Sequence, residues 1–446
     1  MGVLTLLRTL NLEKISTRRQ RIGQKARDAP ELVFTSLADN IDLVWLWEAL
    51  HRTRKDGAVG VDGVDWRTYA SNGQENLRAL LDRFKSGSYR APPTKRAYIP
   101  KADGRQRPIA ITALEDKVLQ RAVVMAMEDV YEQDFYDFSY GYRRGKSPHM
   151  ALKAVVDSLN QTNGGWVLEI DVKGFFDAIS HRKLREILDL RVRDGVIRRT
   201  IDKWLRAGVL ENGVVTTAKS GTPQGGVASP LLANIYLHEV LDKWFVQEVQ
   251  PRLRGWSRMF RFADDLVMSF QREEDAKRAK EAIVKRFARY ELEVHPEKAK
   301  LVDFRHPFAK SANRESRKPG SFGFLGFTYY WTRPRGRRGR WFIARKTAKK
   351  KLKAAFGKMK VWMRKSRHLP LAEQAKTLGQ KLRGHYAYYG IWGNTASLKD
   401  FFYHVVRMWR KWLSRRGQKP YVSWDEMVTI LKHAKLPPPR MVHRNV

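Results

Sequence analysis

The sequence predicts an α+β protein that combines many helices with short strands. Three observations favour this fold class. Apolar residues at helical spacing fill segments such as 42–55 and 115–135, short apolar runs of strand length flank tight polar turns at 91–108 and 258–270, and no internal repeat is present. The chain has 446 residues, enough for two or three domains with substantial cores.

The pattern assigns the elements in order along the chain. Residues 1–90 are mainly helical, and a strand, a turn at Asp103-Gly104 and a second strand follow over 91–108. Helices are then predicted over 115–135, 181–190, 198–209 and 273–292, and strands over 165–171, 258–270 (a hairpin), 294–304 and 322–331. Ser229 and Pro230 favour a helix start, with Ser229 as its N-cap.

Charge is the strongest compositional signal. The chain carries 86 Lys and Arg against 46 Asp and Glu, a formal net charge of +40. Such a field attracts polyanions, above all nucleic acid. An anionic membrane surface is the weaker alternative, and no run of 18 or more apolar residues predicts a membrane span. The chain has no Cys, which excludes disulfides and cysteine-based zinc sites.

The positive charge is concentrated after residue 331. Residues 331–420 contain 26 Lys and Arg and only two acids, Glu373 and Asp400. The helices predicted there interleave basic residues with Trp, Tyr and Phe, a combination that suits a phosphate backbone and stacked bases. The N-terminal stretch is Arg-rich without the pattern of a secretory signal, so an organellar transit peptide stays possible.

Asp264 and Asp265 stand side by side between two apolar runs, in "RMFRFADDLVMSF". A surface turn is the ordinary interpretation of such a pair. The flanking runs instead favour a β-hairpin whose tip carries two like charges, and a divalent cation such as Mg²⁺ would relieve their repulsion. A third carboxylate is then expected, and Asp171 at the end of the strand 165–171 is the candidate, although a strand-end cap explains it equally well.

Two further features follow Asp171. Asp177 is the less favoured metal ligand and is expected to cap the next helix. The segment "GTPQGG", Gly221–Gly226, is a Gly-rich loop at a helix entrance, where backbone can approach a ligand closely. An ordinary loop before an apolar helix is the alternative.

Taken together, the motifs resemble a known family. The ordered segments "RPIAI", "DVKGFFDAI", "GTPQGGVASPLLANIYL", "FADDLVM", "LEVHPEKAKL" and "FGFLGF" resemble those of reverse transcriptases. Other segments, among them "SYGYRRGKSPHMAL" and "LRGHYAYYGIWGNTASLKDFF", are similar to group II intron-encoded reverse transcriptases, also called maturases. The resemblance covers nearly the whole chain.

The resemblance implies roles for individual residues. Asp171, Asp264 and Asp265 match the carboxylates that bind two Mg²⁺ ions, Gln224 matches the residue that helps hold the incoming dNTP, and Phe176 matches the gate against a ribose 2′-hydroxyl. Lys101 and Arg107 match basic residues that grip the triphosphate, and Lys298 is the candidate proton donor to pyrophosphate. "FLGF" resembles the segment that positions the primer end.

The resemblance also implies an architecture: a right-hand polymerase with fingers and palm around an antiparallel sheet, followed by a helical thumb or maturase domain. We expect an N-terminal extension and the start of the fingers over 1–90, fingers and palm over 91–330, the thumb over 331–416 and a tail, a possible DNA-binding remnant, over 417–446. Phe262 stands where most relatives have Tyr. The Cys-containing endonuclease domain of many relatives is not expected, so second-strand cleavage would need another source.

The function implied is RNA-directed DNA synthesis coupled to binding of a group II intron RNA, with splicing and retrohoming of that intron. The expected partners are the intron RNA, an RNA template with a DNA primer, a DNA target and dNTPs, without a membrane; the expected location is the bacterial cytoplasm at the nucleoid, with an organelle as the alternative. Two other functions stay open: a splicing-only maturase without synthesis, and a domesticated reverse transcriptase in defence or repair. A simple basic nucleic-acid-binding module is the plainest alternative.

Overall fold

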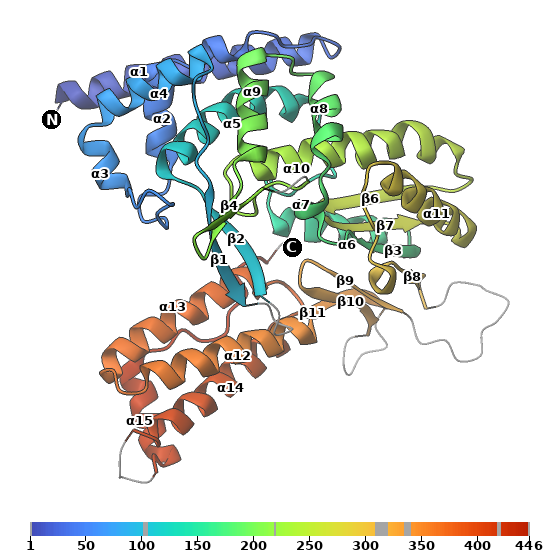
Figure 1. Ribbon diagram of the computed structural model, residues 1–446. Helices are drawn as coiled ribbons and strands as arrows, with labels where there is room; N and C mark the ends of the chain where they lie inside the picture. The colour runs from blue at the N-terminus through green and yellow to red at the C-terminus, as the bar shows by residue number, and fades with distance from the viewer. Residues whose placement is uncertain are drawn as a thin grey trace.

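The computed structural model describes residues 2–100, 106–217, 220–307, 320–333, 340–416 and 421–444, and only the backbone of residues 2–12, Pro100 and Lys298. Figure 1 shows three regions: helices from the N-terminal half at the top, a sheet with its covering helices at the right, and a bundle of C-terminal helices at the lower left. Helices and strands are segregated in this way in an α+β protein, so the predicted fold class is confirmed.

The N-terminal layer is built around one buried helix, α5 (Leu114–Asp134), most of whose side chains are inaccessible to solvent. The indole of Trp45 donates to the carbonyl of Ala122 at 2.9 Å, and Arg19 pairs with Asp129 inside the layer. The surrounding helices are α1 (Gly2–Asp28), α2 (Leu43–Arg52), α3 (Trp66–Ser71), α4 (Gly73–Ser86) and α9 (Gly195–Arg206). The helices predicted for the first 135 residues and for 198–209 are therefore present.

A four-stranded sheet, in the order β2-β1-β4-β5, projects from this layer toward the C-terminal bundle (Figure 1). Its hairpin, β1 (Thr94–Pro100) and β2 (Gln106–Ile111), is antiparallel as predicted, and the expected turn at Asp103-Gly104 lies outside the described residues. Two short strands that the sequence pattern does not predict, β4 (Val209–Glu211) and β5 (Val214–Thr216), extend the sheet, with β4 parallel to β1.

The central sheet has the order β6-β7-β3-β8, and every neighbouring pair is antiparallel. Side chains alternate across it: Leu168 and Ile170 of β3 belong to the large core with the N-terminal helices, whereas Val167 belongs to a second core on the opposite face. The strands are β3 (Trp166–Asp171), β6 (Ser257–Phe262), β7 (Asp265–Phe270) and β8 (Lys300–Asp303).

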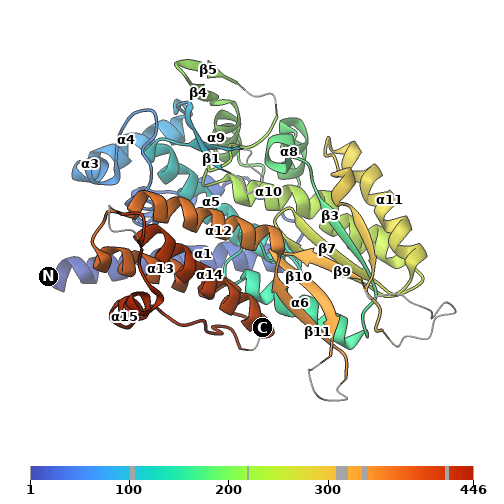
Figure 2. The ribbon, with the colours of Figure 1, turned by 90° about the horizontal axis from the view of Figure 1, so that it is seen from below.

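Helices pack on this sheet and connect its strands. They are α6 (Pro148–Gln161), α7 (Phe175–Ala178), α8 (His181–Asp189), α10 (Ser229–Leu237) and α11 (Glu273–Arg289). After α10 the helix continues with wider π-type turns over His238–Lys243 and Phe245–Val249. Figure 2, seen from below, shows α11 along one side of the sheet and α6 beneath β10 and β11.

A third sheet joins the central sheet to the C-terminal bundle. It contains β9 (Ser321–Phe324), β10 (Phe327–Thr332) and β11 (Phe342–Thr347) in the order β11-β10-β9. The segment expected to form the helical thumb, 331–416, contains a strand before its first helix: β11 pairs antiparallel with β10, and most of its side chains are buried. The bundle consists of α12 (Lys349–Ser366), α13 (Leu371–Tyr389), α14 (Thr395–Leu413) and α15 (Trp424–Ala434).

Candidate functional site

Two acidic strand ends meet in the central sheet. Asp171, the last residue of β3, lies directly opposite Asp265, the first residue of β7. Asp264 occupies the two-residue turn between β6 and β7. Side chains of directly opposed residues lie on the same face of a sheet, so three carboxyl-bearing residues come to one sheet edge. The β-hairpin predicted around the Asp pair is confirmed.

A buried arginine holds the turn from behind. Arg261 is fully buried; its Nε donates to Asp242 at 2.8 Å, and its Nη1 donates to Asn234 Oδ1 at 3.0 Å and to the Ala263 carbonyl at 3.2 Å. Ala263 has a φ of 55°, a strained conformation for a residue with a Cβ. A Cβ on Gly141 would lie 2.3 Å from the nitrogen of Ala263, so only glycine lets the two backbones approach this closely.

The electrostatics of this edge are unfavourable for several ionised carboxylates. Burial raises the pKa of Asp265 to about 7, and the negative charges of Asp264 and Asp171 add to this rise. The backbone N–H of Leu325 donates to Asp265 Oδ2 at 3.2 Å, and this hydrogen bond lowers the pKa of Asp265. Glu169, two residues before Asp171, also has a raised pKa because it is largely buried. Several carboxyl groups thus share one largely buried edge of the sheet.

The chemistry of this donor set fits a hard divalent cation such as Mg²⁺, which prefers carboxylate oxygens and relieves like-charge repulsion. The type and placement of these residues suit such an ion, but their side chains do not already enclose a metal site. In the part of the chain that the structure describes, no three acidic or histidine side chains are already gathered closely enough to enclose a metal ion.

The Gly-rich loop Gly221–Gly226 lies against the segment that follows β3. The N–H of Thr222 donates to the carbonyl of Phe176 at 2.7 Å, and on the other side the N–H of Ala110 in β2 donates to the carbonyl of Gln224 at 2.7 Å. These contacts join one side of the loop to Phe176, which follows Asp171 by five residues, and the other side to β2. The loop thus connects the central sheet to the projecting hairpin.

Two helix caps expected from the sequence are not formed. The first residue of α10 is Ser229 itself, the cap position is Ala228, and the Ser229 hydroxyl turns back to donate to the Gly-rich loop. The helix α8 is capped by Ser180 rather than by Asp177. Asp177 instead accepts a hydrogen bond from the side-chain amide of Gln224 at 3.2 Å. The expectation failed because a longer-range partner competes for each side chain.

Arg107 lies on β2 with an exposed side chain. Burial raises the pKa of the Tyr142 hydroxyl, the charge of Asp264 raises it further, and the charge of Arg107 lowers it. The charges of Arg107 and Asp264 therefore both act on Tyr142.

The two lysines expected at the site cannot be placed in full. Lys101 lies outside the described residues, and so does the side chain of Lys298. The backbone of the short helix Pro296–Lys298 follows His295, whose N–H donates to the carbonyl of Asp171 at 2.9 Å. The segment that carries Lys298 is therefore tied to the acidic end of β3.

Sequence reasoning missed residues that complete this site. Tyr142 and Leu325 both have positive φ, 56° and 49°, as does the nearby Ala263. Three strained non-glycine residues around the same carboxylates are typical of a functional site. Both segments, "SYGYRRG" and "FGFLGF", carry a glycine next to the strained residue, but no periodicity predicts that either approaches the Asp pair.

A comparison with protein families matches residues 99–329, more than half of the chain, to the family described as reverse transcriptase (RNA-dependent DNA polymerase). The matched range begins in β1 and ends in β10. It therefore contains every candidate residue discussed above, including the three aspartates and the Gly-rich loop.

Curated proteins give the same relationship. The chain is 39% identical over 201 residues to protein YkfC of Escherichia coli, and 35% identical over 232 residues to the group II intron-encoded protein LtrA of Lactococcus lactis. These stretches are 44% and 51% of this chain and 53% and 38% of the relatives. The nuclear intron maturase 4 of Arabidopsis thaliana is 23% identical over 237 residues, 52% of this chain and 27% of that protein.

The matches thus span about half or less of each relative's length. Within the described ranges, no helix has the length and apolar character needed to cross a bilayer. From the family match, the chain belongs to the reverse transcriptase (RNA-dependent DNA polymerase) family, and it is similar to a protein named as encoded by a group II intron.

Proposed function

We propose that this chain is an RNA-directed DNA polymerase whose catalytic centre is the edge where β3 meets β7. The observation that carries the proposal is the register that sets Asp171 opposite Asp265, with Asp264 in the adjoining turn. Carboxylates gathered at a sheet edge, with a Gly-rich loop and a basic strand beside them, suit a substrate that carries a triphosphate.

The proposal assigns the regions as a right hand. The projecting hairpin sheet and the N-terminal helices are the fingers, the central sheet with α10 and α11 is the palm, and the bundle α12–α14 is the thumb. In terms of the chain, fingers and palm span 91–330 after an N-terminal extension, the thumb spans 331–416 and a tail spans 417–446. Figure 1 shows the three regions that this assignment names: the N-terminal helices with the projecting hairpin, the central sheet, and the C-terminal bundle.

In the proposed reaction, the 3′-hydroxyl of a DNA primer attacks the α-phosphate of a dNTP, a phosphodiester bond forms, and the bond to pyrophosphate breaks. Asp171, Asp264 and Asp265 would hold two Mg²⁺ ions, drawing their carboxylates together by side-chain rotation. When bound, such ions activate the hydroxyl and stabilise the leaving group.

The chain's own residues orient the nucleotide. Gln224, held by Ala110 and Asp177, presents its amide beside the incoming nucleotide, and the Phe176 ring lies under the sugar and leaves no room for a 2′-hydroxyl. Arg107 and Lys101 bind the triphosphate as cations. Lys298, on the segment joined to Asp171, donates a proton to the departing pyrophosphate.

We also propose that the chain binds the RNA of its parent group II intron and assists splicing and retrohoming. The support is the similarity to LtrA, named as group II intron-encoded, and to a protein named as an intron maturase. The positive charge of residues 331–420 is further support for RNA binding, because this segment contains 26 Lys and Arg residues and only two acids.

Primer extension tests the proposed synthesis. Purified protein, a DNA primer on an RNA template, dNTPs and Mg²⁺ are incubated with the wild type, with Asp264→Ala and with Asp157→Ala, which removes an exposed carboxylate paired with Lys153 on α6. Extension by the wild type and the control but not by Asp264→Ala supports the proposal. A wild type that makes no product over a range of templates and salt concentrations refutes it, and intron RNA binding then becomes the function to measure.

A further inference from the structure

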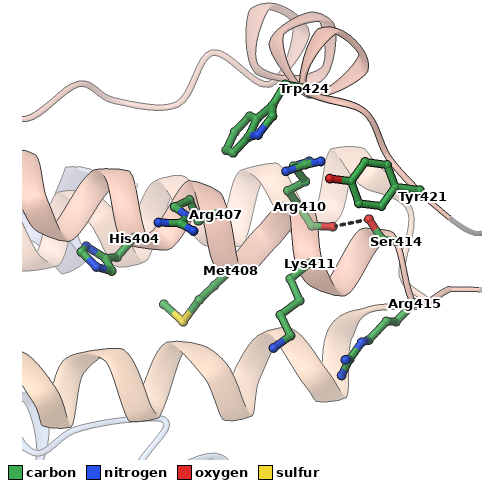
Figure 3. A pocket seen from close by; sticks show the side chains of 9 residues that line it. All are labelled: His404, Arg407, Met408, Arg410, Lys411, Ser414, Arg415, Tyr421 and Trp424. Atoms are coloured by element: carbon green, nitrogen blue, oxygen red, sulfur yellow. Dashed lines mark hydrogen bonds between the residues drawn. The ribbon is translucent and has the colours of Figure 1, made fainter.

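The tail packs beside the last long helix of the bundle and forms an open groove of about 510 Å³. One wall is the outer face of α14, which carries Arg407 and Lys411 one turn apart, together with Arg415 just beyond the end of the helix. The other wall is the tail, which contributes Tyr421 and Trp424. Figure 3 shows both aromatic side chains directed toward α14.

The aromatic wall is fixed by one arginine of α14. The guanidinium of Arg410 lies 4.5 Å from the ring centre of Tyr421 and 4.3 Å from that of Trp424, and its Nε donates to the carbonyl of Val422 at 2.8 Å. The Ser414 hydroxyl, a turn later, accepts from the Val422 N–H at 3.0 Å. Four contacts, made by Arg410 and Ser414 to the segment 421–424, therefore hold the two rings in place beside the helix.

These rings remain largely open to solvent even though they are held. Tyr421 is 67% exposed and Trp424 is 44% exposed. Large aromatic rings fixed at a surface and left uncovered are typical of binding sites. Since Arg410 occupies only part of each ring, aromatic surface remains for a ligand.

The groove is also strongly positive. Arg407, Lys411 and Arg415 are exposed, and none of the described side chains that line the groove is acidic. The acids nearby are engaged or peripheral: Asp400 pairs with His404, and Glu426 accepts from the Ser423 N–H as part of the cap of α15. Asp425 is exposed next to Trp424 but is not part of the lining. The ligand is therefore anionic and presents a flat face.

The groove lies away from the acidic sheet edge. In Figure 1 and in Figure 2, α15 is at the end of the bundle opposite to the central sheet. A strand bound here would not be the few nucleotides at the primer end. It would be either a distant part of the template or another nucleic acid.

We propose that this groove binds single-stranded RNA, with phosphates on Arg407, Lys411 and Arg415 and one base stacked on Trp424 or Tyr421. A duplex does not fit this chemistry, because its base faces are covered by neighbouring base pairs. The flat surface of an anionic bilayer does not reach rings in a concave groove. The choice of RNA as partner rests on the proposed function, whereas the groove and its charge do not.

Fluorescence anisotropy with a labelled oligouridylate of about 12 nucleotides tests the site. The variants are Arg407→Glu/Lys411→Glu and Trp424→Leu, and the control is Lys376→Glu/Arg383→Glu, which makes the same charge change on exposed residues of α13. The groove variants should raise Kd at least about tenfold, and the control only about two- to threefold through the long-range field. Near-UV circular dichroism reports whether each variant keeps the native fold.

Two further arms separate the possible sources and failures. An oligodeoxythymidylate of the same length distinguishes RNA from DNA, and a duplex competitor should not displace the oligouridylate. Crosslinking of a 4-thiouridine oligonucleotide should map to peptides that contain Tyr421 or Trp424. Equal Kd values for the groove variants and the control, or crosslinks confined to residues 91–330, would overturn the proposal. If primer extension fails while these groove effects hold, the polymerase proposal alone is lost.

Discussion

Asp171 on β3 and Asp265 on β7 face each other in one antiparallel pair, 94 residues apart in the chain. Like charges placed directly opposite destabilise a sheet, and this pair has Asp264 beside it and Glu169 one pleat away. The arrangement is unfavourable for folding by itself. Under the proposed function a bound cation offsets this repulsion, so the register of β3 against β7 connects the fold to the proposed chemistry.

Phe176 is predicted to exclude ribonucleotides. The ring packs edge-on against Phe175, with centroids 5.5 Å apart, and its backbone is held by Thr222. Phe176→Ala should lower the preference of kcat/KM for dNTPs over rNTPs at least about tenfold, because the space for a 2′-hydroxyl opens. Single-nucleotide incorporation measures the ratio. Phe176→Tyr keeps the ring and should keep the preference; an unchanged ratio in Phe176→Ala would argue against the gate.

Asp177 is predicted to position Gln224. It accepts from the Gln224 amide at 3.2 Å, at an exposed position where one hydrogen bond contributes little to stability. Asp177→Ala should raise KM for dNTPs by about two- to tenfold and change kcat less. Asp177→Asn retains an acceptor oxygen, so its KM for dNTPs should lie between those of the wild type and Asp177→Ala. A loss confined to kcat would instead indicate that Asp177 acts on the reacting groups.

Arg261 and Asp242 form a fully buried ion pair behind the turn that carries Asp264. Arg261→Met should destabilise the protein by about 3–5 kcal/mol, because Asp242 is left buried without its cation. Arg261→Met/Asp242→Leu should recover most of that loss in urea unfolding. Since Arg261 also donates to the Ala263 carbonyl, the double variant should remain slow in primer extension although it folds. Wild-type rates in the double variant would show that the arginine is only structural.

His238 makes stability depend on pH. Burial first, and then the positive charges of Arg261 and Lys243, lower its pKa to about 3. In the unfolded chain the imidazole is protonated below about pH 6.5, whereas in the folded chain it stays neutral down to about pH 3. Folding stability is therefore lost as pH falls through this window, by up to about 5 kcal/mol.

The matched variant is His238→Phe, whose ring can keep the edge-on contact with Phe135. Urea unfolding at several pH values between 7.5 and 4 should give a smaller loss of stability for the variant than for the wild type. Parallel curves for the two proteins would mean that the folded state protonates His238 as readily as the unfolded one.

The local parts of the site could be predicted from sequence because local patterns determine them. Apolar runs on both sides of Asp264 and Asp265 indicate the hairpin, and the helix spacing of 115–135 indicates α5. The strand that lies opposite Asp265 was expected because Asp171 ends an apolar, strand-like run. The family resemblance and the confirmed α+β class agree with these patterns.

The rest depends on contacts between distant segments. Leu325 reaches Asp265 across 60 residues, and Tyr388 of α13 in turn donates to the Leu325 carbonyl at 2.9 Å. No periodicity encodes such a chain of contacts. Likewise Ser229 prefers the Gly-rich loop to a cap, and β11 forms because β10 offers an edge before the basic helices begin. Tertiary partners overrode local preference at each of these positions.

Binding of Mn²⁺, a paramagnetic substitute for Mg²⁺, tests most directly whether the three aspartates form one cation site. Electron paramagnetic resonance would count bound ions in the wild type, in Asp171→Asn, Asp264→Asn and Asp265→Asn, and in Asp157→Asn as a control. We expect the wild type and the control to bind Mn²⁺ equally and each site variant to bind it at least about tenfold more weakly. Undiminished binding in all three site variants would contradict it.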